Sequence, residues 1–177
     1  VFAFYQFTTP PLFFNKVQGL DLALLPEYNR RFNVLKKLGF IDSNTEAVTQ
    51  KGQIAIGIRT ADELILTEII VDNVFNDYEP EVIVALLSSL VFEEKSSNEP
   101  ILTDNLKEGY AKMANIVLRV SDIQKEFNLD YINKDTNVAL NIGLIEVVYE
   151  WANGKSFKEI TNITDCLEGT IVRTIVR

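Results

Sequence analysis

The sequence predicts a mostly α-helical protein whose main part is a helical bundle. Three observations carry this prediction. Apolar residues recur three or four positions apart through most of the chain, which is the period of one helix face. Residues that start or stop helices, such as Pro80 and Gly154, separate these apolar runs. Hydrophobic residues are 47% and charged residues 24% of the 177 residues, an ordinary composition for a compact core.

Residues 1–25 are expected to form an arm or linker. They are rich in phenylalanine and are interrupted by Pro10 and Pro11, which suits an extended segment better than a helix. We assign this segment no function. The first helix is predicted to run from Pro26, a residue that suits the first helical position, to Gly39, which can end a helix in the left-handed conformation.

Residues 26–61 as a whole predict the back half of a winged helix. After the first helix, short runs at 40–41 and 47–49 flank a polar turn and predict a small β-hairpin, with a return segment that begins at Lys51 and Gly52. A helix, a hairpin and a return segment make up that half of the fold. Such a fold packs against other domains about as often as it holds nucleic acid, so we leave both roles open.

Residues 62–177 predict the helical bundle itself. Asp62 suits the N-cap of its first helix, and Leu66, Ile70 and Val74 mark one apolar face of that helix. The second helix is apolar on nearly every side over residues 82–92. Because such a helix has to be surrounded by others, we place it at the centre of the bundle.

The third predicted helix is the longest. It covers about residues 104–128, and Thr103 or Asp104 suits its N-cap. At 1.5 Å per residue it is on the order of 35 Å long. Its apolar stripe consists of Leu106, Tyr110, Met113, Val117 and Val120. This stripe predicts a helix that packs along one side against its neighbours.

Shorter helices are predicted in the remainder. The fourth helix ends at Gly154, which accepts the left-handed conformation. Ser156 and Glu159 have the spacing of a capping box and predict the start of a fifth helix. Thr164 or Asp165 suits the N-cap of a sixth helix, whose apolar residues continue to the end of the given sequence.

Composition excludes several chemistries. The chain has no histidine, so it has no Ser-His or Cys-His pair and no histidine-bearing zinc site. Lys and Arg number 17 against 25 Asp and Glu, and the net charge of −8 argues against a surface that is basic overall, though not against a local RNA path. Cys166 is the single cysteine, so we expect a small buried side chain in an intracellular or redox-indifferent protein.

No motif predicts an active site. Residues 154–156 read GKS, like the end of a phosphate-binding loop, but Tyr149 stands where that motif requires its first glycine. The acidic pair at 62–63 is better explained by helix capping than by the acidic box of an ATPase. Tyr149, Trp151 and Phe157 offer rings on which bases can stack, but their helical spacing favours burial in the core.

Several blocks, in order along the chain, carry a resemblance to a known family. They are PEYNRRFNVLKKLGFID, KGQIA, ADELILTEIIVDNVFND, EPEVIVALLSSLVFEE, GLIEVVYEWANGKSFKEI and TDCLEGTIVR. Together they resemble the C-terminal part of the DExH-box RNA helicases that feed the RNA exosome, over residues 26–177. The blocks after residue 61 resemble the helical domain of these helicases that is called DSHCT, whose bundle includes a "ratchet" surface. PEYNRR, EPEVIVALLS and GLIEVVYEWANG favour the cytoplasmic superkiller type, whereas VFND and KSSNEP are similar to its nuclear exosome-cofactor sister.

The resemblance implies a parent enzyme that unwinds RNA in the 3′-to-5′ direction. Its two RecA-like domains would use ATP and Mg, while the winged helix and the bundle would close a ring around the single strand. Neither the phosphate loop nor the acidic box is present in this chain, so we expect no cofactor and no catalytic residue in it. The implied partners are single-stranded RNA, the RNA exosome, and the tetratricopeptide and WD-repeat subunits of the superkiller complex. The implied location is the cytoplasm, or the nucleus for the sister, and the family pattern continues beyond the last residue given, so the bundle is expected to be incomplete.

The resemblance also implies which residues contact RNA. In the family, the ratchet surface is formed by the helix end after the ALLS block and by the EGTIVR helix. Glu94 follows ALLSSLVFE, and Arg177 lies four residues beyond Arg173 of EGTIVR, so Glu94, Arg173 and Arg177 are the candidate RNA-binding residues. A carboxylate accepts hydrogen bonds from base amino groups, and arginine stacks on a base or pairs with phosphate. The alternative for each is a solvated charge at a helix end, and Glu168 is an alternative ion-pair partner for Arg173.

Two further functions stay open from the sequence. The first is an acidic helical adaptor that binds proteins and no RNA, which the net charge of −8 favours. The second is a winged-helix DNA-binding protein, which requires a basic recognition helix. Arg30, Arg31, Lys36 and Lys37 supply only part of such a helix.

Overall fold

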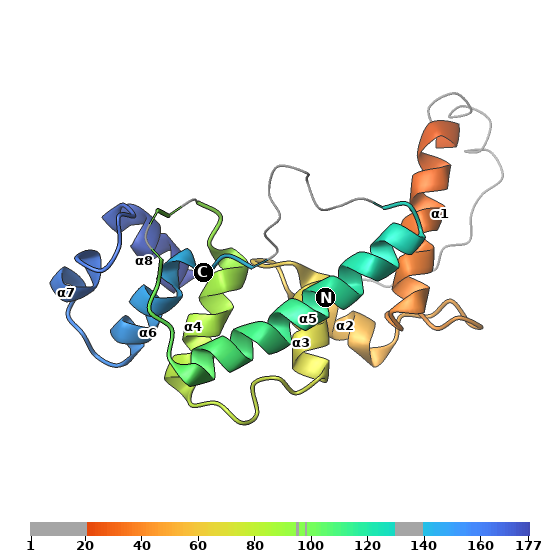
Figure 1. Ribbon diagram of the computed structural model, residues 1–177. Coiled ribbons are helices and arrows are strands. Elements are labelled where there is room, and N and C mark those ends of the chain that lie inside the picture. The colour runs from red at the N-terminus through yellow and green to blue at the C-terminus, as the bar shows by residue number, and fades with distance from the viewer. Residues whose placement is uncertain (1–20, 95, 98, 130–139) are drawn as a thin grey trace, which may run out of the picture.

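A computed structural model describes residues 21–94, 96–97, 99–129 and 140–177, and the side chains from residue 24 onward (Figure 1). Residues 1–20 of the predicted arm therefore lie outside the described residues. The described chain is mostly helical and contains no β-sheet, which confirms the predicted fold class. Its elements are α1 (Asp21–Lys37), α2 (Gln50–Gly57), α3 (Glu63–Val71), α4 (Pro80–Val91), α5 (Asp104–Glu126), the 3₁₀ helix η1 (Ile142–Leu144), α6 (Ile145–Ala152), α7 (Phe157–Thr161) and α8 (Glu168–Val176).

The first helix is longer than its sequence pattern predicts. It begins at Asp21 rather than at Pro26, so the proline lies inside α1 instead of at its first position. The predicted end is correct, because α1 stops at Lys37 and Gly39 follows with a φ of +76°. A left-handed residue of this kind is strained for any side chain other than glycine, so Gly39 ends the helix cleanly.

The winged-helix detail is not confirmed. The expected hairpin is reduced to one antiparallel bridge between Ile41 and Val48, and the expected return segment is the helix α2. The side chain of Thr49 caps α2 by accepting a hydrogen bond from the backbone N–H of Gly52. A Cβ atom at Gly52 would collide with the carbonyl oxygen of Phe40, so this glycine allows α2 to pack closely on the segment after α1.

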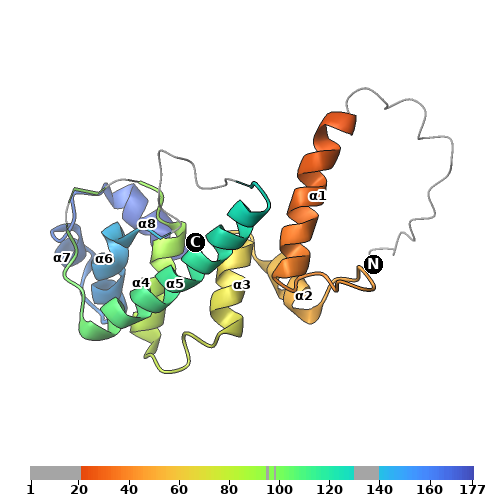
Figure 2. The same ribbon diagram turned by 45° about the vertical axis from the view of Figure 1, so that its right-hand side comes forward.

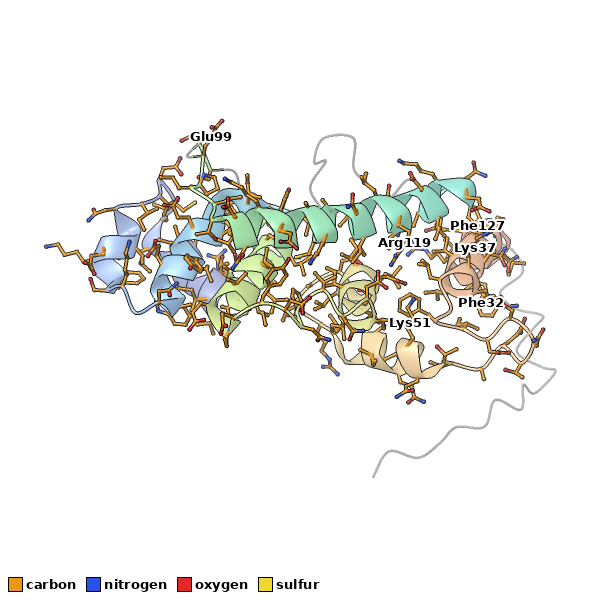
Figure 3. All side chains as sticks on the ribbon, turned by 60° about the horizontal axis from the view of Figure 1, so that its bottom comes forward. Phe32, Lys37, Lys51, Glu99, Arg119 and Phe127 are labelled. Carbon is orange, nitrogen blue, oxygen red and sulfur yellow. The ribbon has the colours of Figure 1, made fainter. Side chains whose placement is uncertain are left out.

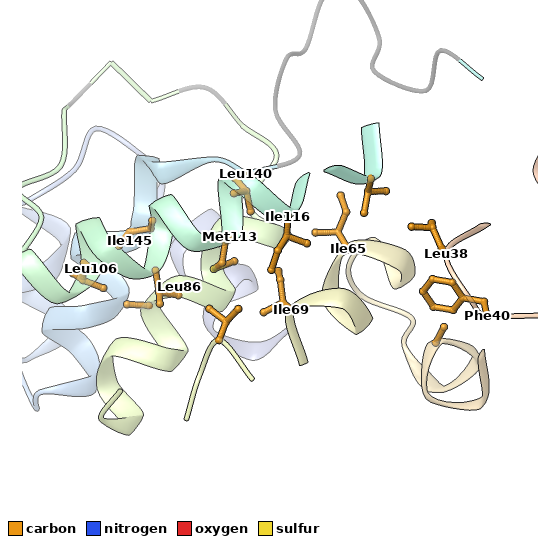
Figure 4. Close-up of a cluster of buried hydrophobic side chains, with 14 of the residues drawn as sticks. Leu38, Phe40, Ile65, Ile69, Leu86, Leu106, Met113, Ile116, Leu140 and Ile145 are labelled. Atoms are coloured by element: carbon orange, nitrogen blue, oxygen red, sulfur yellow. The ribbon is translucent and has the colours of Figure 1, made fainter. Parts of the chain in front are cut away.

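The bundle is organised around α4 and the long helix α5. As predicted, α4 is central, and it contacts α5, η1, α6 and α8. The predicted stripe of α5 is confirmed, because Leu106 and Met113 point into the core (Figure 4) and are fully buried. Val120 is only 1% exposed. Gly109 lets α5 approach α4, because a Cβ there would lie 2.5 Å from Cδ1 of Leu86. α5 also contacts α3 and α1, and it therefore links the bundle to the first helices (Figure 3).

The buried face of α3 differs from the predicted one. Ile65 and Ile69 point into the core between α3, α4 and α5 (Figure 4). Of the predicted face, Ile70 is exposed and Leu66 is half-buried, and only Val74, beyond the end of α3, is buried. The predicted N-cap is correct, since Asp62 accepts hydrogen bonds from the backbone N–H groups of residues 64 and 65. The face was mispredicted because α3 is apolar around most of its circumference, so periodicity alone could not choose the side.

A second buried cluster joins the last helices to the end of α4. It consists of Phe92, Leu144, Val147, Val148, Ile160 and Ile171. Helices α6, α7 and α8 gather around it at one end of the molecule (Figure 2). The predicted capping box is confirmed, because the carboxylate of Glu159 accepts from the backbone N–H of Ser156 at 2.8 Å. This cluster fixes α8 beside the residues that follow α4, and so it positions the site described below.

The last helix begins later than predicted and is only partly buried. Leu167, not Thr164 or Asp165, occupies the N-cap of α8, because Asp165 accepts instead from residues 96 and 97. Ile171 is buried, but Val172 and Val176 are exposed. Cys166 is a free thiol, half-buried against the second cluster. None of the helices in the described ranges is long and apolar enough to cross a membrane.

Candidate functional site

The three candidate residues lie together at the junction of α4 and α8. Glu94 is the second residue after Phe92, the C-cap of α4. Arg173 lies in α8, which packs against α4, and Arg177, one turn later, is the C-cap of α8. The pocket between them is lined by residues 91–94 of the first segment and by Thr170, Arg173, Thr174 and Arg177 of the second. Two stretches about 80 residues apart in the sequence therefore build one surface.

Two ion pairs cross this junction. Nη1 of Arg173 lies 3.7 Å from Oε1 of Glu94, so the alternative partner Glu168 is not the one that the structure shows. Nη1 of Arg177 lies 3.4 Å from Oε1 of Glu93. Neither distance is that of a short, strong hydrogen bond. The four side chains are 41–83% exposed, so each pair contributes little to stability and leaves the guanidinium groups accessible.

Hydrogen bonds hold Glu94 more firmly than its ion pair with Arg173 does. The hydroxyl of Thr170, a residue only 6% exposed, donates to the carboxylate and lies 3.0 Å from both of its oxygens. Nδ2 of Asn141 donates to the backbone carbonyl oxygen of Glu94 at 2.7 Å. The backbone N–H of Asn141 in turn donates to the carbonyl oxygen of Ser89 in α4. Glu94 is thus held at both its side chain and its backbone.

The loop beside the site is anchored by Asp165. Its carboxylate accepts hydrogen bonds from the hydroxyls of Ser96 and Ser97 and from the backbone N–H of Ser97. These bonds, led by those from Ser97, favour the ionised form and lower the pKa of Asp165 to about 2. Asp165 therefore stays charged near neutral pH and connects the segment before α8 to the segment after α4.

The arrangement suits binding better than acid–base chemistry. Glu93, Glu94, Arg173 and Arg177 together carry no net charge. The arginines present exposed planar cations that can stack on a base or exchange a carboxylate for a phosphate. Glu94 has lone pairs for a base amino group. Among the described residues, no group of three or more Cys, Asp or Glu side chains is placed to hold a metal ion.

A separate charged network lies between α2, α3 and α5. Glu68 is 4% exposed and forms ion pairs with Lys51 and with Arg119, the latter at 3.0 Å. Arg119 also binds Asp72 at 2.7 Å, and this hydrogen bond is the main reason that the pKa of Arg119 is raised. Figure 3 shows Lys51 and Arg119 beside α3. Because Lys51 also donates to the carbonyl oxygen of Leu38, these cations connect helices and do not form an open basic surface.

Sequence reasoning missed Thr170 and Glu93 as members of the site. Thr170 was part of the block EGTIVR, and it lies three residues before Arg173, on the same face of the helix. That spacing was the available signal.

The predicted burial of aromatic rings was wrong in two cases, because Trp151 and Phe157 are each 40% exposed, while Tyr149 is half-buried against the core.

Comparison with known proteins gives consistent matches. The DSHCT (NUC185) domain model matches residues 45–177. The DExH-box ATP-dependent RNA helicase DExH11 of Arabidopsis thaliana is 40% identical over 163 residues, which are 90% of this chain and 12% of that protein. The antiviral helicase SKI2 of Saccharomyces cerevisiae is 40% identical over 159 residues, covering 88% of this chain and 12% of that protein. The exosome RNA helicase MTR4 of Homo sapiens is 37% identical over 153 residues, covering 86% of this chain and 15% of that protein. The chain therefore spans about an eighth of the length of these curated relatives.

Proposed function

Since the chain belongs to the DSHCT domain family found in superkiller-type and MTR4-type RNA helicases, we propose that it is a non-catalytic module that guides single-stranded RNA through such a helicase. The proposed parent is an ATP-dependent 3′-to-5′ helicase that delivers RNA to the exosome for decay. ATP and Mg would bind in motor domains outside this chain. The module itself would contribute surface to the RNA path and no chemical step.

The observation that carries this proposal is the junction between α4 and α8. It brings Glu94, Arg173 and Arg177 into one partly open pocket, with exposed cations held only by weak surface pairs. Single-stranded RNA offers phosphates and unstacked bases, and both are chemical partners of arginine. A site without net charge would bind single-stranded RNA weakly, and weak binding suits a strand that moves past the site better than tight binding does.

We further propose that the parent is of the superkiller type. The identity to DExH11 and SKI2 is 40%, against 37% to human MTR4. The proposed partners are then the RNA exosome and the tetratricopeptide and WD-repeat subunits of the superkiller complex, and the proposed location is the cytoplasm. An MTR4-type parent would instead be nuclear.

Salt-dependent RNA binding tests the proposal. The full 177-residue chain is titrated against a fluorescein-labelled single-stranded oligoadenylate and against a duplex of equal length, and binding is measured by fluorescence anisotropy at increasing salt. We expect preference for the single strand. Replacing Arg173 and Arg177 with Ala should weaken binding and reduce the slope of log affinity against log salt by up to about 1.4, the value for two phosphate contacts on single strands.

A matched control removes two exposed cations elsewhere. Lys107 and Lys125 on α5 also form surface ion pairs, with Asp104 and Asp122. Their double replacement with Ala should leave the slope nearly unchanged. Equal losses in the two double variants would contradict a site at α4 and α8, because they would show a general effect of net charge.

A protein-binding adaptor is the second candidate function. It is favoured by the exposed side chains of Leu24, Leu25 and Tyr28, in the first half of α1. This helix projects away from the bundle (Figure 2). No RNA binding at low salt, together with exosome or superkiller subunits retained by the chain and released by changes in α1, would favour this function over the RNA-guiding one.

A further inference from the structure

We infer that Thr170 is a positioning residue for Glu94 in RNA binding, an inference that rests on the proposed function. The hydroxyl of Thr170 reaches both carboxylate oxygens at 3.0 Å from a position that is 6% exposed. Glu94 itself is about half exposed at its side chain. Thr170 therefore anchors the carboxylate from the protein side and leaves its outer lone pairs for a ligand.

The anchoring also keeps Arg173 available. The distance from Arg173 to Glu94 is 3.7 Å, which is an ion pair without a close hydrogen bond. A carboxylate released from Thr170 can turn toward the guanidinium and form the shorter, two-point contact that this pair of groups prefers. That contact would occupy the N–H donors of Arg173 and the acceptor oxygens of Glu94 at once. Thr170 thus prevents the two RNA-binding groups from satisfying each other.

Backbone contacts restrict the other ways in which Glu94 can move. Asn141 holds the carbonyl oxygen of Glu94 at 2.7 Å, and Phe92, two residues earlier, is buried in the second cluster. The main chain at residue 94 is therefore fixed, and the remaining freedom belongs to the side chain. One hydroxyl is enough to restrict that freedom, because it bonds to the charged end of the side chain.

Thr161 provides a control outside the pocket. It ends α7, which packs on α6, and its hydroxyl donates to the backbone carbonyl oxygen of Lys158 at 3.0 Å. Thr170→Val and Thr161→Val each remove a hydroxyl from a helix at this end of the bundle while keeping the β-branched shape. Only the first substitution removes a bond to Glu94.

The experiment measures binding of fluorescein-labelled single-stranded oligoadenylate to the full 177-residue chain. The variants are Thr170→Val, Thr170→Ser, Thr161→Val, Glu94→Ala and the double variant Thr170→Val with Glu94→Ala. Thr170→Val is expected to weaken binding about tenfold, as the lower end of the range for loss of a hydrogen bond to a charged group implies, whereas Thr170→Ser and Thr161→Val should stay within about twofold of the original chain. In the Glu94→Ala background, Thr170→Val should have no further effect.

Each outcome decides a separate claim. Loss of binding in both valine variants, or in the serine variant, would overturn the positioning role and show that the substitutions merely loosen the helices around the second cluster. A normal affinity in Thr170→Val beside a weakened one in Glu94→Ala would refute the positioning role alone. An unchanged affinity in Glu94→Ala would refute Glu94 as an RNA contact, which is a failure of the proposed function itself. Circular dichroism of each variant identifies any that does not fold. If Thr170→Val does not fold, Thr170→Ala, which also removes the hydroxyl, takes its place in the same comparisons.

Discussion

Replacing Glu68 with Gln should destabilise the packing of α2, α3 and α5 more than the loss of any single surface ion pair would. The substitution keeps the size of a side chain that is 4% exposed but removes its charge. Lys51 and Arg119 then lose a buried anionic partner. Breaking a fully buried pair in this way costs about 3–5 kcal/mol.

The expected loss is smaller than about 3–5 kcal/mol, because both cations keep other partners. Arg119 keeps Asp72 at 2.7 Å and has a side chain that is 47% exposed, while Lys51 keeps the carbonyl oxygen of Leu38 at 2.7 Å. Both cations therefore retain a partner or water. We expect a loss of about 2 kcal/mol in the free energy of unfolding, which for a chain of this size lowers the unfolding midpoint by roughly 4–8 °C.

Thermal unfolding followed by circular dichroism at neutral pH measures the loss. Glu108→Gln is the control, because Glu108 pairs with Lys112 on the surface of α5 at 2.8 Å with both side chains well exposed. It should leave the midpoint nearly unchanged. Equal midpoints for the Glu68 variant and the original chain would refute the reasoning, since they would mean that the buried pair contributes no more than a solvated one.

Further predictions concern packing and pH. Gly52→Ala should destabilise the chain by about 1–3 kcal/mol in urea unfolding, because the new Cβ collides with the backbone oxygen of Phe40, and an unchanged midpoint would mean that α2 shifts freely. Met113→Ala should cost about 3 kcal/mol, since the side chain is fully buried and leaves a cavity, and a loss below about 1 kcal/mol would show a loosely packed core. The pKa of Asp165 is lowered from 3.8 to about 2 by bonds from Ser97, so its stabilising effect is complete above pH 3.8 and disappears as the pH falls toward 2. Asp165→Asn should therefore flatten this part of an acid titration of stability, and an unchanged profile would contradict the anchoring role of Asp165.

The elements that sequence predicted correctly are those with local signals. α5 combines an N-cap at Thr103 with a regular apolar stripe, and both are confirmed. α2 has an N-cap of the same kind, Thr49, but no regular apolar stripe. Ile54 and Ile56 alternate as in a strand, and the helix depends on Gly52, which packs against the distant backbone of Phe40. Contacts of that kind depend on the folded chain and cannot be read from the period of the sequence.

The proximity of the candidate residues was predictable, whereas their individual contacts were not. The order of the family blocks brought together Glu94 and Arg173, which do form an ion pair. It did not show that Arg177 pairs with Glu93, or that Thr170 holds the carboxylate of Glu94. Those contacts depend on how far α8 is displaced and rotated along the end of α4, which the second buried cluster determines.

The most direct test of the central claim is a map of RNA contacts in the native full-length protein. Single-stranded RNA that contains thiouridine is photo-crosslinked to the protein, and the crosslinked peptides are identified by mass spectrometry. The RNA-guiding function predicts crosslinks in residues 91–94 and 170–177, reduced when Arg173 and Arg177 are replaced with Ala. Crosslinks confined to the motor domains, with none at the junction of α4 and α8, would contradict it.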